Sequence, residues 1–429
     1  MKKFLLVSGY LFLMCSGNLL ALTLEEAISE SLNNNLSIKM ENSTLGIAEE
    51  NLLQSKADFL PSISLSGSIS ETETSGIITQ NGISSSDYEL SPSSKSIILS
   101  QTIFNGFGRA YSLQSSKSEL ELQKLNKFKT EQDITLETIE AYFNILASEK
   151  TLKSYEDNFK TVSERFSSTK KEFEVGLSSK TDVAQAEAYY NAAKIDMLNA
   201  KISHQNIKNA FNNLVGIEPN NLSFSSISGF LPKSFSEFNE LVISNNLSIK
   251  MAQSNLDIKS SNVGVAKSAY YPQVNLTATK SELDEFSSTV DEITNEEIEA
   301  TISWPIFNKG KSSSTVRQAE KLKNRYMILL QKTQQDTLTL ASNIWQKYSI
   351  SKDTLDAANL SYLASQTAFE GTKIEQEVGE RTVLDVLNSR QSLLNAEIKL
   401  FNEQKNQEVI KAQVMYLAGI LTLENIRGI

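Results

Sequence analysis

The chain has almost none of the residues on which covalent and metal chemistry usually depend. Of its 429 residues, one is a cysteine, Cys15, and one is a histidine, His204. If the first 21 residues are removed as a signal, no cysteine remains, which excludes disulfides, thiolate nucleophiles and cysteine-ligated metals. His204 lies in a stretch that we expect to be helical, where a lone histidine is usually a surface or packing residue. The sequence therefore predicts no catalytic residue, no metal site and no cofactor.

Proline and glycine are missing from a long central stretch. Neither occurs between Arg109 and Phe173, so about 65 residues are able to form one helix roughly 95 Å long at 1.5 Å per residue. The apolar residues of this run step by three and four, and such a narrow stripe is typical of a coiled-coil seam rather than of a globular helix. The stripe consists of Leu152, Tyr155, Phe159, Val162 and Phe166, and a later run repeats it with Leu355, Ala358, Tyr362, Ser365 and Phe369.

The clearest apolar run is a short one at the N-terminus. Lys2 and Lys3 precede the apolar residues 4–14, and Ala21 ends a plausible cleavage site, so residues 1–21 are expected to be a secretory signal. The run is shorter than the roughly 20 residues of a membrane-spanning helix. A lipoprotein signal at Cys15 is the alternative, but Met14 stands where a small residue is expected.

Positive charge and phosphate-binding motifs are also in short supply. The formal net charge of −10 becomes −12 without Lys2 and Lys3, which argues against nucleic acid as a partner. Gly106 and Gly108 are too closely spaced for a phosphate-binding loop, and they fit better as a strand-to-helix joint. An enzyme is therefore not expected.

The most informative feature that is present is an internal repeat. The sequence NNLSIKM at 34–40 returns at 245–251, 211 positions later, and Pro61 returns as Pro272. Phe104 returns as Phe307, and from there on the offset is 203, so the difference of eight residues lies between Pro61 and Phe104. We therefore expect two tandem copies of one unit, 22–235 and 236–429.

Each copy is expected to contain one helix, two strands and two further helices. Pro61 and Pro272 end the first helix and favour extended structure around them. The first copy is predicted to have helices at about 24–59, 109–173 and 180–214 and strands at about 62–75 and 94–104. The second is predicted to have helices at about 238–270, 310–376 and 383–418 and strands at about 273–285 and 296–306. A longer turn at 75–86 in the first copy and a shorter one at 287–294 in the second account for the eight-residue difference between the copies.

The predicted strands alternate apolar and polar residues, which gives each one an apolar and a polar face. The apolar positions are Ile63, Leu65, Gly67 and Ile69, then Val274, Leu276 and Ala278, then Ile298, Ala300, Ile302 and Trp304. The remaining strand is less regular, with Ile97, Leu99 and Ile103 on one face. A half-buried soluble sheet and a membrane barrel both fit this pattern. The barrel is favoured because the long helices lack a broad apolar stripe with which to cover a sheet.

Four strands cannot close a barrel, and an unpaired strand edge cannot persist in lipid. Outer-membrane barrels have eight or more strands, so the chain is expected to oligomerise. Three subunits with twelve strands are favoured, because two subunits would leave a lumen filled by side chains.

Two glycine–aspartate segments complete the pattern. Residues 175–183 read VGLSSKTDV and residues 378–387 read VGERTVLDVL. Together with WPIFNKG at 304–310 and LTLEEA at 22–27, they resemble segments of the TolC family of outer-membrane efflux proteins. The resemblance covers essentially the whole mature chain in two copies.

The resemblance implies a mainly α protein with a membrane β-barrel. A homotrimer would form a twelve-stranded barrel in the outer-membrane lipid and a long α-helical barrel in the periplasm. The implied function is a passive export duct, either for small toxic compounds or for type I protein secretion. The implied partners are a periplasmic adaptor and an inner-membrane pump of the RND or ABC type.

Site residues follow from the resemblance by position. The periplasmic gate would include Asp385, Arg381, Asp182 and Thr181, and the hairpin tips that dock the adaptor would include Gly176, Gly379, Val175 and Val378. Asn388 stands where a second acidic residue can occur, and Gln376 stands where an aromatic gate partner can occur. A contact between Arg381 and an aspartate of the other hairpin would hold the gate closed.

Two alternatives remain open at this point. The spacing of Ser179 with Asp182, and of Thr382 with Asp385, also fits capping boxes that restart a helix after a glycine. The aspartates would then satisfy backbone N–H groups, although a pore role is favoured for Asp385 because of Arg381. For the whole protein, the alternative is a structural or adhesive coiled-coil trimer of the envelope, which would leave the alternating strands unexplained.

Overall fold

The computed structural model describes residues 22–74, 88–287 and 290–427. The expected signal at 1–21 and the expected turn at 75–86 lie outside these residues. The chain forms two compact units that do not coincide with the sequence repeats. The sheet unit comprises Lys39–Lys129 and Asn246–Thr337, and the tip unit comprises Met1–Ile38, Thr130–Asn245 and Leu338–Ile429. Each unit therefore takes segments from both copies of the repeat.

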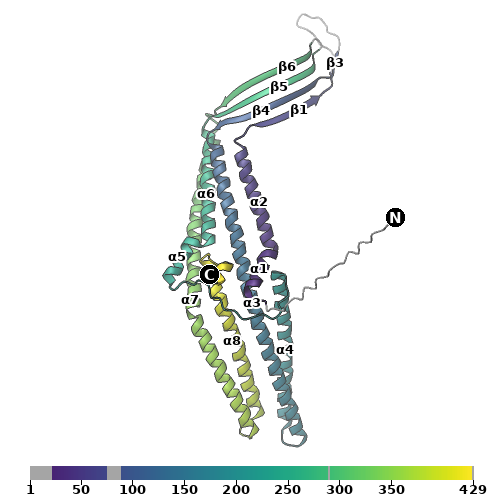
Figure 1. Ribbon diagram of the computed structural model, residues 1–429, viewed down its shortest axis with the longest axis vertical. Helices are drawn as coiled ribbons and strands as arrows, with labels where there is room; N and C mark the ends of the chain where they lie inside the picture. Colours follow the sequence, from purple (N-terminus) through teal and green to yellow (C-terminus); the bar gives the residue numbers. More distant parts are fainter. Residues whose placement is uncertain (1–21, 75–87, 288–289, 428–429) are drawn as a thin grey trace, which may run out of the picture. The chain divides into compact units, whose positions relative to one another are not determined.

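The sheet unit contains one four-stranded antiparallel sheet in the order β1-β4-β5-β6 (Figure 1). The strands are β1 (Ser62–Ile69), β4 (Ser93–Asn105), β5 (Gln273–Ser287) and β6 (Val290–Ser303). A separate two-stranded ribbon pairs β2 (Thr72–Thr74) with β3 (Tyr88–Leu90). Each repeat thus contributes two neighbouring strands, and β1 and β6 are the edges of the sheet.

The alternation in the sequence appears as two chemically different faces. Ile63 lies opposite Leu99, and Leu65 lies opposite Ile97. On the other face the hydroxyls of Ser66 and Ser96 are 2.7 Å apart. The apolar side chains of β1 are largely exposed, because no element within the described residues covers them.

Two details of the sheet differ from the sequence prediction. A bulge between Thr102 and Phe104 removes Ile103 from the register and places Phe104 opposite Val274, so Ile103 does not continue the face of Leu99. The turn expected at 287–294 is shorter, because β5 continues to Ser287 and β6 begins at Val290. Bulges and registers depend on the partner strand, which the sequence of one strand does not reveal.

Four helical segments complete the sheet unit. They are most of α2 (Leu36–Ala57), α6 (Leu247–Lys267) with the short 3-10 turn η1 (Ser268–Tyr270), and the first parts of α3 (Gly108–Glu174) and α7 (Lys311–Glu377). Both long helices begin after two residues in the left-handed region. These are Gly106 and Phe107, with φ of 65° and 68°, and Lys309 and Gly310, with φ of 61° and 77°. A side chain at Gly106 would also lie 2.5 Å from the Ser268 carbonyl oxygen, so the joint requires glycine there.

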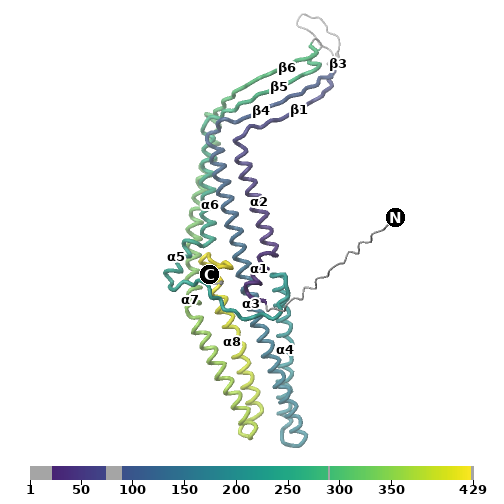
Figure 2. Tube along the Cα trace, in the orientation of Figure 1, coloured from purple at the N-terminus to yellow at the C-terminus, as the bar shows by residue number. Residues whose placement is uncertain are grey.

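The tip unit contains the second parts of α3 and α7 together with the helices that follow each of them. These are α4 (Lys180–Val215) and α8 (Val383–Leu417), and three short helices join them: α1 (Leu24–Asn34), α5 (Phe235–Asn245) and α9 (Leu423–Arg427). The trace in Figure 2 shows α3 turning back into α4 and α7 turning back into α8. None of the helices within the described residues is long and apolar enough to cross a membrane.

Two apolar cores hold the short helices against the long ones. The larger core packs Ile28, Tyr142, Phe143 and Phe211, all essentially fully buried. The Tyr142 hydroxyl lies 2.8 Å from the Leu22 carbonyl oxygen and 2.7 Å from that of Ser223, so this polar group has hydrogen-bond partners inside the core. In the second core the Trp345 ring stacks on Phe238 at 5.5 Å between centroids.

The first helix of each copy is interrupted, which the sequence analysis did not predict. The helix expected at 24–59 breaks at Asn35, whose Oδ1 accepts a 2.8 Å hydrogen bond from the Ser37 N–H. The helix expected at 238–270 breaks at the equivalent Asn246, whose Oδ1 accepts from Ser248 and Ile249. Asparagine competes with the helix by capping the next one, so each expected helix becomes two.

Candidate functional site

The two turns that reverse α3 into α4 and α7 into α8 have the same construction. Gly176 and Gly379 adopt φ of 79° and 83°, a conformation that ends helices and that glycine adopts without strain. The next residue then closes the turn, with the Leu177 N–H bonded to the Glu172 carbonyl and the Glu380 N–H to the Glu375 carbonyl. A Cβ at either glycine would meet nothing within 4 Å, so backbone conformation rather than space is what requires glycine.

A capping box restarts the helix after each turn. The Asp182 carboxylate accepts from the Ser179 N–H at 2.9 Å, and the Asp385 carboxylate accepts from the Thr382 N–H at 2.9 Å. The hydroxyls of Ser179 and Thr382 also donate to these carboxylates, at 2.7 and 2.8 Å. The side-chain and backbone hydrogen bonds from Ser179 lower the pKa of Asp182, and those from the Thr382 backbone and side chain lower the pKa of Asp385. Both aspartates are therefore committed to capping in this chain.

Arg381 does not make the expected contact with an aspartate of the other hairpin. Its Nε donates to the Glu375 carboxylate at 2.9 Å, within the same hairpin. This hydrogen bond raises the pKa of Arg381. Both side chains are about half exposed, so solvent screens the pair and it adds little to stability. The turn between α7 and α8 brings Glu375 and Arg381 together, so the partner of Arg381 is an acidic residue of its own hairpin rather than an aspartate of the other one.

Several polar contacts join the two hairpins, and three of them involve residues 376–390 of the second hairpin. The Arg165 guanidinium donates to the Gln376 amide oxygen at 2.8 Å, and the Tyr189 hydroxyl donates to the Asn388 amide oxygen at 2.8 Å. Arg390 donates to the Ser154 carbonyl at 3.3 Å. Gln376 and Asn388 were singled out in the sequence as departures from the family, and here each accepts a hydrogen bond from the other hairpin. Their donors, Arg165 and Tyr189, had no distinguishing signal in the sequence.

Arg390 is the least well satisfied of these groups. It is 5% exposed, its guanidinium is 3.3 Å from Glu397, and it lies 5.7 Å from the centre of the Phe369 ring. The Nε of Arg390 and one carboxylate oxygen of Glu397 have no hydrogen-bond partner. A buried ion pair with unpaired polar atoms contributes little net stability to the folded chain.

The hairpin turns enclose a cavity of about 260 Å³ to which both hairpins contribute. Asp182 lines it from the first hairpin, and Gln376, Gly379 and Arg381 line it from the second. Four of the site residues expected from the sequence therefore surround one space. Asp385, Asn388 and Thr181 do not line it, and Val175 and Val378 are exposed at the turns.

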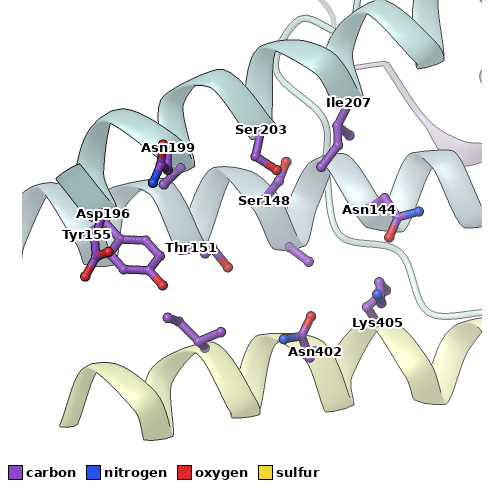
Figure 3. A pocket seen from close by; sticks show the side chains of 13 residues that line it. Asn144, Ser148, Thr151, Tyr155, Asp196, Asn199, Ser203, Ile207, Asn402 and Lys405 are labelled. Atoms are coloured by element: carbon purple, nitrogen blue, oxygen red, sulfur yellow. The ribbon is translucent and has the colours of Figure 1, made fainter. Parts of the chain in front are cut away.

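A second, larger groove lies further along the helices and is lined by polar side chains (Figure 3). It measures about 400 Å³ between α3, α4 and α8, with Asp196 and Lys405 as its only charged groups. A groove of about 440 Å³ between α7 and α8 uses the repeat-related positions. Ser148 and Thr151 of the first groove correspond to Ser351 and Thr354 of the second.

Comparison with known proteins identifies the family to which this architecture belongs. The profile of a family described as "Outer membrane efflux protein" matches residues 27–217 and 240–419. The chain belongs to the outer membrane efflux protein family. The two matched ranges fall in the two copies of the repeat, and the resemblance inferred from the sequence is confirmed.

Individual relatives agree with the family assignment. The outer membrane efflux protein BepC of Brucella suis is 24% identical over 405 residues, covering 94% of this chain and 87% of that protein. The outer membrane protein TolC of Escherichia coli is 24% identical over 398 residues, covering 88% and 78%. The CmeC outer membrane channel of Campylobacter jejuni has the same fold, with a TM-score of 0.82 at 20% identity over 93% of this chain and 86% of that one.

The family assignment confirms two further expectations. The protein is located in the outer membrane, and it acts as a duct for efflux or secretion. Its family and fold are those of channel proteins. Within the described residues, no group of three or more histidine, cysteine or acidic side chains is arranged to hold a metal ion.

Proposed function

We propose that the hairpin turns form the periplasmic entrance of an export duct, and that contacts between the two hairpins of each subunit hold this entrance closed. The supporting observation is that Gln376 and Asn388 each accept a 2.8 Å hydrogen bond across the hairpins. The gate would comprise Asp182, Thr181, Gln376, Arg381, Asp385 and Asn388. Opening would separate α7 and α8 from α3 and α4, breaking both hydrogen bonds.

The contacts are weak enough to be broken by a partner. A net contribution of about 0.5–1.5 kcal/mol is typical for the neutral Tyr189 to Asn388 bond, and about 1.5–3 kcal/mol for the charged Arg165 to Gln376 bond. An entrance stabilised by a few kcal/mol per subunit is closed at rest and opens when a docked protein supplies that energy. The aspartates would keep their capping role and provide negative charge at the entrance.

The exposed apolar residues of the turns provide a surface for that partner. Val175, Leu177 and Val378 are each at least 70% exposed beside Gly176 and Gly379. Apolar side chains presented on an otherwise polar surface are typical of a protein-binding site. We infer that a periplasmic adaptor docks here and connects the duct to an energised inner-membrane pump of the RND or ABC type, with three subunits forming one duct.

The test compares Tyr189→Phe with Tyr190→Phe. Tyr189→Phe removes the hydroxyl that bonds Asn388, and we expect larger or more frequent channel openings in a planar bilayer than for wild type. Tyr190 stacks on Phe166 at 5.3 Å between ring centroids, and none of the hydrogen bonds described here uses its hydroxyl, so Tyr190→Phe should conduct like wild type. Equal currents from all three proteins would contradict the proposed gate.

The duct itself is tested separately, through export. Cells that lack their own outer-membrane channel should regain resistance to small toxic compounds when they express this chain with its adaptor and pump. Deleting the exposed apolar groups with Val175→Ser, Leu177→Ser and Val378→Ser should abolish that resistance while leaving the bilayer current intact. Loss of current together with resistance would show that the turns are needed for folding rather than for docking.

A further inference from the structure

The four strands of the sheet carry their charged residues unevenly on the two faces. Residues that pair directly across neighbouring strands lie on the same face, and the next row of pairs lies on the opposite face. One row across the sheet is Ile63, Leu99, Ala278 and Ile298. The next row is Ser64, Ile98, Thr279 and Glu297. We call the faces to which these two rows belong the apolar face and the polar face.

Two carboxylates belong to the polar face, and both are on β6. Glu297 and Glu299 are exposed, and they flank Ile298, which is 80% exposed on the apolar face. The row that ends at Glu299 is Ser62, Ser100, Thr277 and Glu299. Each carboxylate is therefore the only charged member of a row that otherwise consists of neutral residues.

The lysines of the sheet lie on the apolar face. The four strands contain two of them, Lys95 and Lys280. Lys280 forms an ion pair with Glu296 at 2.9 Å, and Lys95 lies opposite Glu282. Each lysine thus has a carboxylate beside it on its own face. Among the paired residues of the described strands, the polar face has no lysine or arginine, so the charge of its two carboxylates is not balanced there.

The first copy of the repeat shows that the fold does not require these charges. The equivalents of Glu297 and Glu299, 203 positions earlier on β4, are Ser94 and Ser96. The Ser96 hydroxyl lies 2.7 Å from that of Ser66 on β1. The same face of the equivalent strand is therefore built from neutral hydroxyls, and the negative charge is a property of the second copy alone.

The position of the two carboxylates indicates that they face water. The protein is located in the outer membrane, and the exposed apolar row that contains Ile298 is the part of the sheet suited to lipid. Glu297 and Glu299 flank this residue, so they lie at the same depth as the apolar row. A carboxylate at such a depth is costly unless it faces water, and ionisable residues inside a membrane mark the paths of ions and substrates.

We propose that the polar face of the sheet lines the water-filled duct, and that Glu297 and Glu299 make the duct prefer cations to anions. Carboxylates that line a passage attract ions of opposite charge and repel those of their own sign, and low-dielectric walls strengthen this field. Cations, including positively charged organic compounds, would therefore pass more easily than anions of the same size. The selectivity rests on the proposed duct, since ions must pass along the sheet for these charges to act on them.

The first test is the reversal potential in a planar bilayer with a gradient of potassium chloride. The wild type should prefer potassium, and Glu297→Gln with Glu299→Gln should lower the ratio of potassium to chloride permeability at least about threefold. The preference of the wild type should also weaken with added salt, because the Debye length falls from about 30 Å at 0.01 M to about 10 Å at 0.1 M.

Two matched variants accompany this measurement. Glu292→Gln with Glu296→Gln removes two charges from the same strand, but on the face that carries Lys280, so the permeability ratio should stay at the wild-type value. Ser94→Glu with Ser96→Glu adds two charges at the equivalent positions of the polar face, so the ratio should rise. The first variant shows that the face decides the effect, and the second shows that the strand does not.

A chemical measurement locates the charge without relying on current. Thr279→Cys places a thiol opposite Glu297, and the described residues contain no other cysteine. With each rate divided by that of a small thiol in solution, a cationic thiol reagent should react at least about fivefold faster than an anionic one of the same size, because a unit charge about 5 Å away in water acts on the two reagents in opposite directions. Adding Glu297→Gln should remove most of this difference. Ile298→Cys should react with neither reagent in intact cells, because lipid covers the apolar face.

Two results would overturn the inference. One is a conducting Glu297→Gln and Glu299→Gln variant with the permeability ratio of the wild type, which would leave the duct standing and place its selectivity elsewhere. The other is reaction of Thr279→Cys at equal relative rates with reagents of both charges. A wild type that carries no current would refute the proposed duct itself, and the selectivity with it.

Discussion

The segment between α4 and α5 contacts α8 through a buried carboxylate, Glu408, and removal of this carboxylate should be costly. Glu408 is 2% exposed and accepts hydrogen bonds from the Ile227 N–H at 2.8 Å, the Ser226 hydroxyl at 3.0 Å and the Lys411 ammonium at 2.8 Å. Replacing it with alanine leaves the buried Ile227 N–H without a partner. It also leaves the Lys411 side chain, which is 17% exposed, without its counter-charge.

The magnitude follows from these contacts. Breaking a buried ion pair by removing one partner costs about 3–5 kcal/mol. An unpaired backbone N–H adds about 1–3 kcal/mol, but Lys411 is able to reach water, which offsets part of the total. We expect Glu408→Ala to lower the free energy of unfolding of the tip unit by about 3–4 kcal/mol, taken from these two terms. Glu408→Gln keeps the shape and one acceptor, so about 1–3 kcal/mol is expected.

The assay is urea unfolding in detergent, followed by the fluorescence of Trp345. That residue packs on Phe238 in the core of the tip unit. The other of the two tryptophans, Trp304, is replaced by phenylalanine so that the signal comes from this unit alone. The matched control is Glu403→Ala on the same helix, whose carboxylate pairs with the exposed Lys399, and which should cost only about 0.2–0.5 kcal/mol.

The reasoning would be refuted by a Glu408→Ala protein that unfolds at the urea concentration of the Glu403→Ala control. That result would mean that the segment around Ile227 is held by its apolar contacts alone. If Glu408→Gln lowered the free energy of unfolding as much as Glu408→Ala does, the whole loss would come from the missing negative charge.

Three further predictions concern packing, capping and the pH dependence of a cap. Gly264→Ala places a methyl group against the Tyr111 ring, so it should destabilise the sheet unit by about 1–3 kcal/mol. Adding Tyr111→Ala should restore most of this loss. Thermal unfolding of the single and double variants measures both effects. Thr382→Ala should destabilise the first turn of α8 by about 1 kcal/mol, measured as faster amide hydrogen exchange there. Because the pKa of Asp385 is lowered from its usual 3.8, its capping contribution should be complete above that value and be lost as the pH falls through the lowered pKa. NMR titration of the carboxyl would contradict this if Asp385 took up its proton above pH 3.8.

Much of the fold could be predicted from the sequence because the relevant signals are local or periodic. A stretch without proline or glycine predicts a long helix, and α3 runs without interruption from Gly108 to Glu174. Alternation with serine predicts a two-faced strand such as β1. The capping boxes at Ser179 and Thr382 depend on residues three positions apart, and both are present in the structure.

The candidate site was predicted less completely, because its contacts join residues that are distant in sequence. Gln376 accepts from Arg165, which is 211 positions away, and Asn388 accepts from Tyr189, which is 199 positions away. Arg381 has acidic residues on both sides in sequence, and only the path of the turn selects Glu375. The breaks at Asn35 and Asn246 were missed because asparagine occurs within helices as well as at their caps, and the sequence around it does not decide between the two.

The sequence by itself determined the elements, their order and their duplication, since helix and strand periodicity and capping act within a few residues of one chain. Only the tertiary structure decided which residues of the two copies meet. It paired β4 with β5 and buried Ile258 of α6 while leaving its equivalent Ile47 on α2 exposed. The physical reason is that burial and register depend on the element packed alongside, so two nearly identical segments differ as soon as one of them has a neighbour and the other does not.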